Sequence, residues 1–453
     1  MQRTLNIATL KTIGQDVLLK GWVKTRRDHG KLIFLDLRDR SGIIQVVINP
    51  QVSEETYKIA QGIRPEYVVS VTGKVNKRPE SMLNPELPTG TVEIEAKKIE
   101  ILARAEELPF DIDAPVLNLN LETLLDHRSL SFRHPKIAAI FKVQETIVQS
   151  FRKTLKDLDF VEIQVPTIVA SSTEGGAEVF HLDYYNHHAY LAQSPQLYKQ
   201  ILLTAFERVF TLAHAYRAEP SVTTRHLSEY IGLDAEISFI ENLEEIMKVV
   251  ETVFKNCLKD LAEKNQNELN LYKVSLPKID KIPRLKLREA QEIIFKRTGR
   301  DCRTEPDLAP EDEREICRWA QETYGEELVF ITHYPTKKRP FYTYPDPENP
   351  EFTLSFDLLG KGIEWVTGGQ RINDYQKLLE NIKKWGNKPE DFTTYLEAFR
   401  YGMPPEGGFC IGLERLTGSI LGLANLREAS LFPRDMERID QRLFLSKPKK
   451  GEK

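Results

Sequence analysis

Short runs of alternating apolar and polar residues fill the first hundred positions of the chain. The alternation predicts five β-strands, at Val17–Val23, Leu32–Leu37, Ile43–Ile48, Tyr67–Val75 and Thr91–Ile101. A helical stretch, Ser53–Gly62, lies between the third and fourth strands. This order of elements is typical of a five-stranded oligonucleotide-binding (OB) barrel, although the pattern by itself also fits another small β domain.

Beyond residue 125 the apolar positions take a helical period. Apolar residues recur at three- and four-residue steps behind Pro135, which predicts an amphipathic helix, and a second helix is expected from Leu243 to about Lys264. Strand-like pieces are predicted at Arg208–Leu212, Leu233–Ile240, Ser355–Leu359, Gly362–Thr367 and Gly408–Leu413. Since strands and helices mix without a regular βαβ alternation, we expect an α+β fold with an antiparallel sheet flanked by helices.

Residues 105–125 lack a clear period and contain two Pro-bearing stretches, so they are interpreted as a linker. A chain of 453 residues also exceeds one comfortable core. We therefore expect a barrel domain over residues 1–104, a hinge over 105–125, a large α+β domain over 126–446 and a solvated basic tail over 447–453.

Composition narrows the class of protein. Hydrophobic residues make up 41% and charged residues 29%, as in an ordinary soluble enzyme. No apolar run approaches the roughly 20 residues that span a bilayer, and the N-terminus lacks a signal-peptide core, so a cytoplasmic protein without membrane contact is expected. The four cysteines are widely spaced, which excludes a disulfide framework and gives no zinc pattern.

The net charge of −4 argues against a protein that binds nucleic acid over its whole surface. Charge is unevenly distributed, however. Between Lys20 and Arg40 seven basic residues outnumber three acidic ones. This stretch of the predicted barrel could face phosphates.

Two segments carry side chains suited to phosphate chemistry. Tyr216–Tyr230 places Arg217 and Glu219 on one face of an expected strand, followed by a polar loop with Arg225 and His226. The arginines and the histidine could hold a polyphosphate and Tyr230 could stack on adenine, although an ordinary surface hairpin is the plain alternative. Further on, GGFCIGLER puts small residues where a strand could closely approach a ligand, and then supplies Arg415.

Asp357 and Glu364, in FDLLGKGIEWVTGGQR, add oxygen ligands suited to a magnesium ion shared with substrate phosphates. Isolated acids on strands are usually just solvated. Neither GxGxxG nor GxxxxGK[ST] occurs, so the common dinucleotide and P-loop routes to phosphate binding are unsupported. Separated segments that each carry parts of one phosphoryl-type site are nevertheless unlikely to arise by chance.

Taken together, these segments resemble the class II aminoacyl-tRNA synthetases, specifically the aspartyl type in its short, archaeal-like form. Residues 158–168 resemble the first family motif, whose proline, here Pro166, lies at the dimer interface; residues 216–230 resemble the second and residues 407–416 the third. Other family-like blocks are STEGGAEVF, AQSPQLYKQ, PFYTYPDPE, GGQRI and NLREASLFPRD. The large domain that bacterial aspartyl enzymes insert is absent, since residues 265–340 are too few for it.

The resemblance implies a homodimeric aspartate-tRNA ligase that uses ATP and Mg²⁺ and charges tRNA-Asp. The residues it assigns to ATP are Arg217, Glu219, Arg225, His226, Leu227, Tyr230, Glu364, Gly412 and Arg415, and it assigns the metal to Asp357 and Glu364. Arg217, Arg415 and Glu364 are expected to be catalytic. The attacking group is the already ionised carboxylate of the amino acid, so no protein base is required and positioning with charge stabilisation suffices.

For the amino acid, the resemblance implies that Ser194, Gln196 and Asp234 contact its α-amino end and that Thr367 lies nearby. Glu174 is expected on a loop that closes over the substrate, and Lys199 and Arg371 are expected to bind the side-chain carboxylate. Two buried positive charges would accept aspartate and reject neutral asparagine. A lone helical lysine is otherwise most often exposed to solvent.

In the barrel, Phe34 is expected to stack on an anticodon base, and Arg27 and Gln45 are expected to form hydrogen bonds with the edge of that base. Phe34 could instead belong to the core, and the alternation does not decide. His29 matches a position that is often histidine in relatives that charge both tRNA-Asp and tRNA-Asn, so charging of both is expected.

Three rival functions are an asparaginyl-tRNA synthetase, a paralogue that makes a free amino acid or adenylate without tRNA, and a non-catalytic RNA-binding or regulatory protein. Lys199 disfavours the first, the barrel disfavours the second, and the retained charged residues disfavour the third. The chain departs from the family pattern at Cys410, commonly glycine, at Thr367, commonly serine, and at Pro220-Ser221-Val222 in the loop of the second motif.

Overall fold

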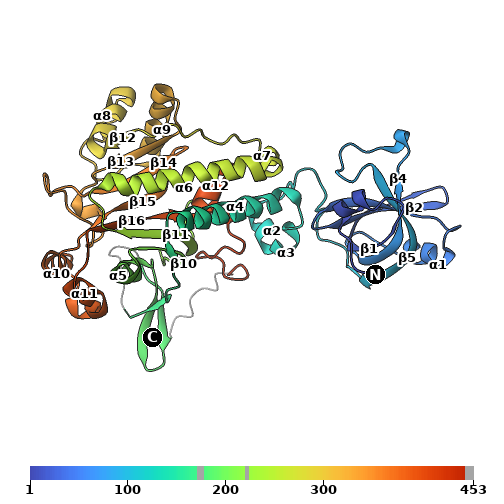
Figure 1. Cartoon of the computed structure of the whole chain (residues 1–453), viewed down its shortest axis with the longest axis horizontal. Helices are drawn as coiled ribbons and strands as arrows, with labels where there is room; N and C mark the ends of the chain where they lie inside the picture. Colours follow the sequence, from blue (N-terminus) through green and yellow to red (C-terminus); the bar gives the residue numbers. More distant parts are fainter. Residues whose placement is uncertain (171–177, 220–223, 444–453) are drawn as a thin grey trace. The chain divides into compact units, whose positions relative to one another are not determined.

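The computed structural model describes residues 1–170, 178–219 and 224–443, and the chain divides into two compact units, Met1–Asn118 and Leu119–Lys453 (Figure 1). The division falls inside the predicted hinge. The last residues of the predicted hinge, 105–125, are helical, because helix α2 (Leu121–Asp126) begins there. The Asn120 side chain caps this helix by accepting a hydrogen bond from the Thr123 amide at 2.8 Å.

The first unit is the predicted barrel, closed in the order β1-β2-β3-β5-β4. Its elements are η1 (Asn6–Lys11), β1 (Asp16–His29), β2 (Leu32–Asp39), β3 (Gly42–Ile48), α1 (Glu54–Gln61), β4 (Val68–Lys77), η2 (Glu80–Met82) and β5 (Val92–Ala103). Alternate residues such as Leu19, Leu35 and Val71 are fully buried inside the barrel. Closure leaves no free sheet edge, which makes a barrel of this size a stable platform.

The second unit is built on an eight-stranded sheet in the order β12-β13-β14-β15-β16-β11-β10-β6. Its strands are β6 (Val161–Glu162), β10 (Arg208–Tyr216), β11 (Glu229–Ser238), β12 (Arg284–Lys286), β13 (Leu328–Thr332), β14 (Ser355–Gly360), β15 (Ile363–Arg371) and β16 (Glu406–Gly412). The six central strands are antiparallel, whereas β12 and β6 pair in parallel at the two edges. The predicted α+β class is confirmed, with a mixed sheet.

A smaller sheet, β7 (Ile168–Val169), β9 (His187–Leu191) and β8 (His181–Tyr184), also belongs to this unit. The helices are α2, α3 (Arg128–Ser131), α4 (Pro135–Asp157), α5 (Gln196–Phe206), α6 (Leu243–Lys264), α7 (Gln266–Tyr272), α8 (Leu287–Thr298), α9 (Pro310–Tyr324), α10 (Tyr375–Lys384), α11 (Thr393–Arg400) and α12 (Leu413–Leu421). Short 3₁₀ turns are η3 (Thr336–Lys338), η4 (Pro389–Phe392) and η5 (Leu426–Ala429). Within the described residues, no helix is long and apolar enough to span a membrane.

Helices α4 and α6 run side by side across one face of the sheet (Figure 1). Phe151 of α4 and Phe254 of α6 are buried against sheet residues such as Leu233, Phe409 and Phe356. Because side chains alternate along a strand, the residues next to these three point to the opposite face. The two helices therefore leave one face of the sheet for polar side chains.

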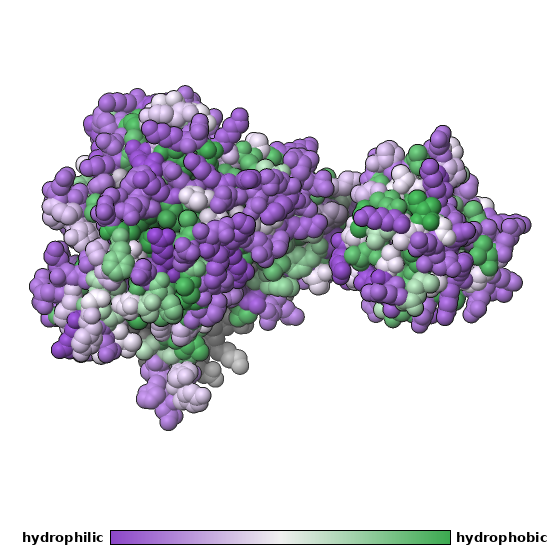
Figure 2. Space-filling view, in the orientation of Figure 1, coloured by the Kyte–Doolittle hydropathy of each residue, from purple (hydrophilic) through white to green (hydrophobic). Residues whose placement is uncertain are grey.

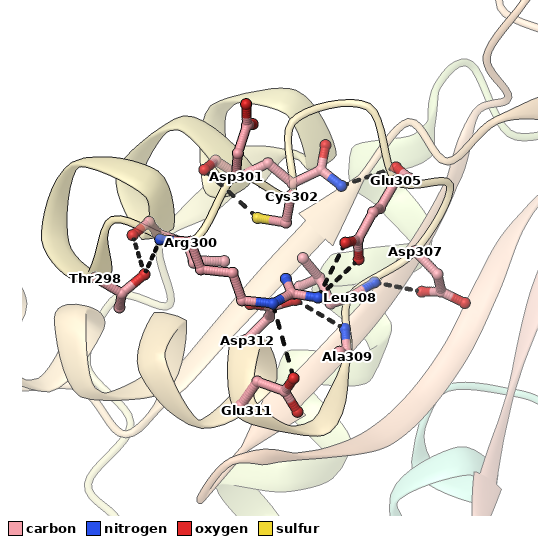
Figure 3. Close-up of polar contacts among 12 residues, drawn as sticks. Thr298, Arg300, Asp301, Cys302, Glu305, Asp307, Leu308, Ala309, Glu311 and Asp312 are labelled. Atoms are coloured by element: carbon pink, nitrogen blue, oxygen red, sulfur yellow. Dashed lines mark hydrogen bonds and ion pairs between the residues drawn. The ribbon is translucent and has the colours of Figure 1, made fainter.

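The segment between the second and third motifs forms a small helical insertion, α8 and α9, with its own core. Figure 3 shows how Arg300 holds its connecting loop: its guanidinium donates to Asp312 at 2.6 Å and to both oxygens of Glu305 at 3.0 Å. Asp312 in turn accepts a bond from the Ala309 amide at 3.0 Å. These bonds fix the first turn of α9.

Hydrophilic side chains cover most of the face that Figure 2 shows.

Candidate active site

A row of polar side chains crosses the face of the sheet away from α4 and α6. Asp357 lies opposite Thr367, Thr367 opposite Cys410, and Cys410 opposite Asp234, so one residue from each of four neighbouring strands joins the row. Cys410 Sγ lies 3.4 Å from Asp234 Oδ2. Two of the departures from the family pattern, Thr367 and Cys410, are therefore neighbours in this row.

A cavity of about 410 Å³ lies over this row, within the size range of small-molecule sites. The predicted residues that line it are Ser194, Gln196, Arg217, Glu219, Arg225, His226, Leu227, Tyr230, Asp234, Glu364, Thr367, Arg371, Gly412 and Arg415. Residues from distant parts of the sequence thus share one cavity. Lys199 and Asp357 do not line it and are buried.

One end of the cavity holds a buried cluster of charges. Lys199, on α5, is fully buried, and its Nζ lies 2.8 Å from Asp234 Oδ1 and 3.0 Å from Glu236 Oε2. Arg371 Nε donates to Glu236 Oε1 at 2.8 Å. Burial opposes the charge of Lys199, but Asp234 and Glu236 outweigh it and raise the pKa of the ammonium group.

The interpretation that Lys199 and Arg371 are two uncompensated positive charges is therefore wrong, since Asp234 and Glu236 balance them within the protein. Glu236 was missed at the sequence level. A signal was present, because Glu236 follows Asp234 by two positions in a strand and so points to the same face. The Gln196 side-chain amide also donates to Glu236, at 3.0 Å.

A third buried carboxyl group lies behind this cluster. Gln200 donates to Glu406 and accepts a bond from the Tyr395 hydroxyl at 3.0 Å. Burial raises the pKa of Glu406 well above its usual range, and the charge of Glu236 adds to the effect. Burial therefore disfavours the charged form of Glu406, and the ion pairs of the cluster join two cations with two carboxylates.

The other end of the cavity holds cations. The Arg217 guanidinium lies over the Tyr230 ring, 5.4 Å from its centroid, and Arg415, in the first turn of α12, donates to Glu364 at 2.8 Å. His226 Nε2 lies 3.7 Å from Glu219 Oε2. Such a set of guanidinium groups suits a polyphosphate, and the flat Tyr230 ring suits a base.

Arg217 and Glu219 are not on a strand, contrary to the expectation from their alternation. β10 ends at Tyr216, paired with Glu229, and the Arg217 amide still bonds the Ser228 carbonyl at 2.9 Å. The Ala218 amide then bonds the Glu178 carbonyl instead, at 2.9 Å. Because successive amides of a strand point to opposite edges, this bond lies on the edge away from β11, as does the bond from the Tyr216 amide to the Ala192 carbonyl at 2.9 Å.

Asp357 is held by an arginine that the sequence did not single out. Arg339, which also lines the cavity, donates to Asp357 Oδ2 at 2.7 Å and to Thr367 Oγ1 at 3.0 Å. Asp357 Oδ1 is buried and has no hydrogen-bond partner among the described residues. This oxygen is suited to a hard cation.

Glu364 completes the candidate metal site. A third of its side chain is exposed at the cavity, but the surrounding protein atoms raise the pKa of its carboxyl group; Arg415 opposes this effect and Asp357 adds to it. No group of three or more metal-binding side chains occurs in the described parts of the chain. A magnesium ion at Asp357 and Glu364 would therefore need further oxygens, as substrate phosphates provide.

The four candidate tRNA residues of the barrel lie on one outer face of β1–β3. Arg27 pairs with Phe34, His29 with Leu32, and Gln45 with Asp36. Ile33 and Leu35 fill the core, so Phe34 between them points outward and is not a core residue. Arg27 donates to Asp36 at 3.0 Å and Gln45 to Glu93 at 3.1 Å. An aromatic ring among polar side chains is the arrangement that single-stranded RNA binders use.

Comparison with known proteins supports the same division of the chain. The model of the tRNA synthetases class II (D, K and N) matches residues 120–436, and that of the OB-fold nucleic acid binding domain matches residues 17–102. This chain belongs to the class II tRNA synthetases. The eight-stranded sheet and its cavity are thus the class II domain, and the barrel is the OB-fold domain.

Relatives of this synthetase match over nearly its whole length. The aspartate--tRNA(Asp/Asn) ligase of Deinococcus radiodurans is 42% identical, covering 97% of this chain and 99% of its own. The aspartate--tRNA(Asp) ligase of Pyrococcus furiosus is 41% identical, covering 96% and 98%. Among solved structures, the asparaginyl-tRNA synthetase of Pyrococcus horikoshii complexed with asparaginyl-adenylate has a TM-score of 0.86 at 34% identity, covering 95% of this chain and 97% of its own.

Some predicted residues of the synthetase cannot be placed. Glu174 and Pro220-Ser221-Val222 lie outside the described residues, as does the tail 447–453.

Glu414, in the first turn of α12, gives a prediction about stability. Burial raises the pKa of its carboxyl group to about 7, although the Ile231 amide donates to it at 3.1 Å. The folded state therefore binds a proton that the unfolded state releases near pH 4.5, so stability falls as the pH rises from about 4.5 to 7. The charged form should cost about 3 kcal/mol above pH 7.

We expect Glu414→Gln to remove this loss. The melting temperature of the variant should exceed that of the wild type at pH 8 and equal it at pH 5. Equal pH dependence in both proteins would contradict the assignment.

Proposed function

We propose that this synthetase is an aspartate-tRNA ligase that forms aspartyl-adenylate from L-aspartate and ATP and transfers the aspartyl group to the 3′ end of tRNA-Asp and of tRNA-Asn. The observation that carries the proposal is the buried cluster of Lys199, Asp234, Glu236 and Arg371 at one end of a cavity whose other end holds Arg217 and Arg415. The curated relatives named above are ligases for aspartate.

Charge balance is the basis of the proposed selectivity. The cluster is neutral as it stands, with two cations and two carboxylates. Aspartate adds one ammonium group, next to Asp234, and one side-chain carboxylate, next to Arg371 and Lys199, so the cluster remains neutral. Asparagine would add the ammonium group without the carboxylate, leaving a buried positive charge uncompensated. Ser194, Gln196 and Thr367 complete the proposed amino acid end.

At the nucleotide end we assign Arg217 to the α-phosphate and to the α-carboxylate of aspartate. One side chain would then bind both reacting groups and hold the attacking oxygen close to the phosphorus. Tyr230 would stack on adenine, with Glu219, Leu227 and Gly412 around the base. Arg225, His226 and Arg415 would hold the outer phosphates and stabilise the charge that develops on the leaving pyrophosphate.

Asp357 and Glu364 would hold Mg²⁺ together with phosphate oxygens. When bound, the ion supplies neutralising charge to the phosphates. The protein's own part is to supply Asp357 Oδ1, which has no hydrogen-bond partner among the described residues because Arg339 bonds only Oδ2.

For tRNA, we propose that residues 1–104 bind the anticodon and residues 126–446 catalyse charging, with 105–125 as the hinge. Arg27, His29, Phe34 and Gln45 would contact the anticodon. We also propose a cytoplasmic homodimer in which Pro166, exposed in this chain, lies at the interface.

Phe34→Ala is expected to lower kcat/KM for tRNA-Asp about 5- to 150-fold, since stacking of one base on an aromatic ring contributes about 1–3 kcal/mol. ATP-pyrophosphate exchange, which needs no tRNA, should be unchanged and serves as the control. Unaltered aminoacylation would remove Phe34 from the anticodon site.

Aminoacylation of two tRNA transcripts tests the proposed function. Radiolabelled aspartate should be attached to tRNA-Asp and to tRNA-Asn. Charging of tRNA-Asp alone would make the enzyme strict and overturn the role of His29. Attachment of asparagine in place of aspartate would instead identify an asparaginyl-tRNA synthetase, the alternative that the charge cluster disfavours.

A further inference from the structure

The helical insertion brings a carboxylate to the nucleotide end of the cavity. Glu313, in the first turn of α9, lies with Oε2 3.4 Å from Arg225 Nη1. Its side chain is only 16% exposed, whereas that of Arg225 is 37% exposed. No role for Glu313 follows from the residues assigned above.

The position of Glu313 is fixed from two sides. The bonds of Arg300 and Asp312 in Figure 3 hold the start of α9. On the other side, α9 packs directly on the turn between β14 and β15, because a Cβ added at Gly362 would lie 2.7 Å from Arg314 Cγ. These strands carry Asp357 and Glu364, so Glu313 is held at a defined place relative to both.

The charges around Glu313 belong to the same end of the cavity. Burial raises the pKa of its carboxyl group to about 7 and the negative charge of Glu364 adds to this effect, while Arg225 and Arg415 oppose it. Glu313 thus interacts with both arginines assigned to the outer phosphates.

A guanidinium group has five N–H donors in a rigid plane, so Arg225 can contact Glu313 with one edge and a phosphate with another. Fixing an arginine side chain costs up to about 2 kcal/mol of rotamer entropy. A carboxylate that already orients Arg225 would reduce this cost when ATP binds.

We propose that Glu313 is a positioning residue for ATP, which orients the Arg225 guanidinium toward the outer phosphates. The inference rests on the proposed function for the role of Arg225. Glu313 has no assigned contact with aspartate, so its effect is confined to the nucleotide.

Calorimetric titration with MgATP tests this inference without requiring catalysis. Glu313→Gln is expected to raise the Kd for ATP about 5- to 20-fold, equivalent to about 1–2 kcal/mol. Glu311→Gln is the matched control: it lies in the same turn, loses the same charge and contacts Arg300 at 3.7 Å instead of Arg225. Its Kd should equal that of the wild type.

A double variant separates positioning from a general structural effect. If Glu313 acts through Arg225, Glu313→Gln should have no further effect in an Arg225→Ala background. In aspartate-dependent exchange, Glu313→Gln should raise KM for ATP and leave KM for aspartate unchanged.

Three results would each overturn the inference. The first is a Kd for ATP that is unchanged or lower in Glu313→Gln, and the second is an equal rise in Kd when Glu313→Gln is added to Arg225→Ala. The third is a wild-type protein that does not bind ATP. If Glu313→Gln weakens ATP binding but the wild type shows no aspartate-dependent exchange, the role of Glu313 in positioning ATP is supported and the proposed function is rejected.

Discussion

Replacement of Lys199 by methionine is expected to lower kcat/KM for aspartate in ATP-pyrophosphate exchange about 10²- to 10³-fold. The lysine is completely buried and lies within 3.0 Å of two carboxylates. Removing one partner of a buried ion pair costs about 3–5 kcal/mol, because the remaining charge has no water to solvate it. The substrate carboxylate would then meet two carboxylates and only one cation, Arg371.

Steady-state exchange with aspartate measures the effect, and thermal unfolding reports how much of it comes from the fold. Lys361→Met is the control, since Lys361 donates to the Ser275 carbonyl and does not line the cavity. Activity of Lys199→Met within about threefold of the wild type would contradict the proposed role of Lys199 in selecting the substrate.

Replacement of Glu364 by glutamine is expected to lower kcat for adenylate formation about 10²- to 10³-fold, the usual effect of removing one charge-stabilising group. The substitution takes away a proposed metal ligand and also the carboxylate that accepts a bond from Arg415 at 2.8 Å. The amide is a poorer ligand for a hard cation. A higher Mg²⁺ concentration for half-maximal activity is therefore expected as well.

Binding of Mn²⁺ in the presence of ATP, followed by electron paramagnetic resonance, gives a readout independent of turnover. Glu364→Gln should bind Mn²⁺ more weakly. Glu162→Gln is the control and should behave as the wild type, because Glu162 lies on β6 and its carboxylate pairs with Arg152 at 3.1 Å. Unchanged Mn²⁺ binding together with unchanged kcat would remove Glu364 from the metal site.

Local patterns were sufficient to predict the elements that create the cavity. Alternation gave the five barrel strands and the strands β10, β14, β15 and β16, because one face of each is buried in an apolar core. Boundaries were less certain: β11 was predicted from Leu233 but begins at Glu229, where polar residues still pair with β10.

Predicted residues of the second and third motifs line one cavity, but their charged partners were not foreseen. The spacing of Glu236 from Asp234 was a signal, whereas Arg339 and Glu406 have no distinctive spacing. Each of the three matters because the fold brings an opposite or like charge next to it. Such pairing depends on which strands become neighbours. A single sequence does not contain that information in any local pattern.

The same limit explains the error about Lys199. Its position in a family-like block predicted a pocket residue, but Lys199 is fully buried and contacts the pocket through Asp234, which lines it. The net charge of the cluster could be counted only once Asp234, Glu236 and Arg371 were seen together. The proposed selectivity therefore depends on charge balance with the whole amino acid rather than on an excess of cations.

The measurement that tests the account most directly is ATP-pyrophosphate exchange with each amino acid in turn, without tRNA. Exchange should depend on L-aspartate and be at least about 10²-fold less efficient with L-asparagine, because the carboxamide leaves one buried positive charge uncompensated. Exchange that depends on asparagine, or no exchange with either amino acid, would contradict the proposed function.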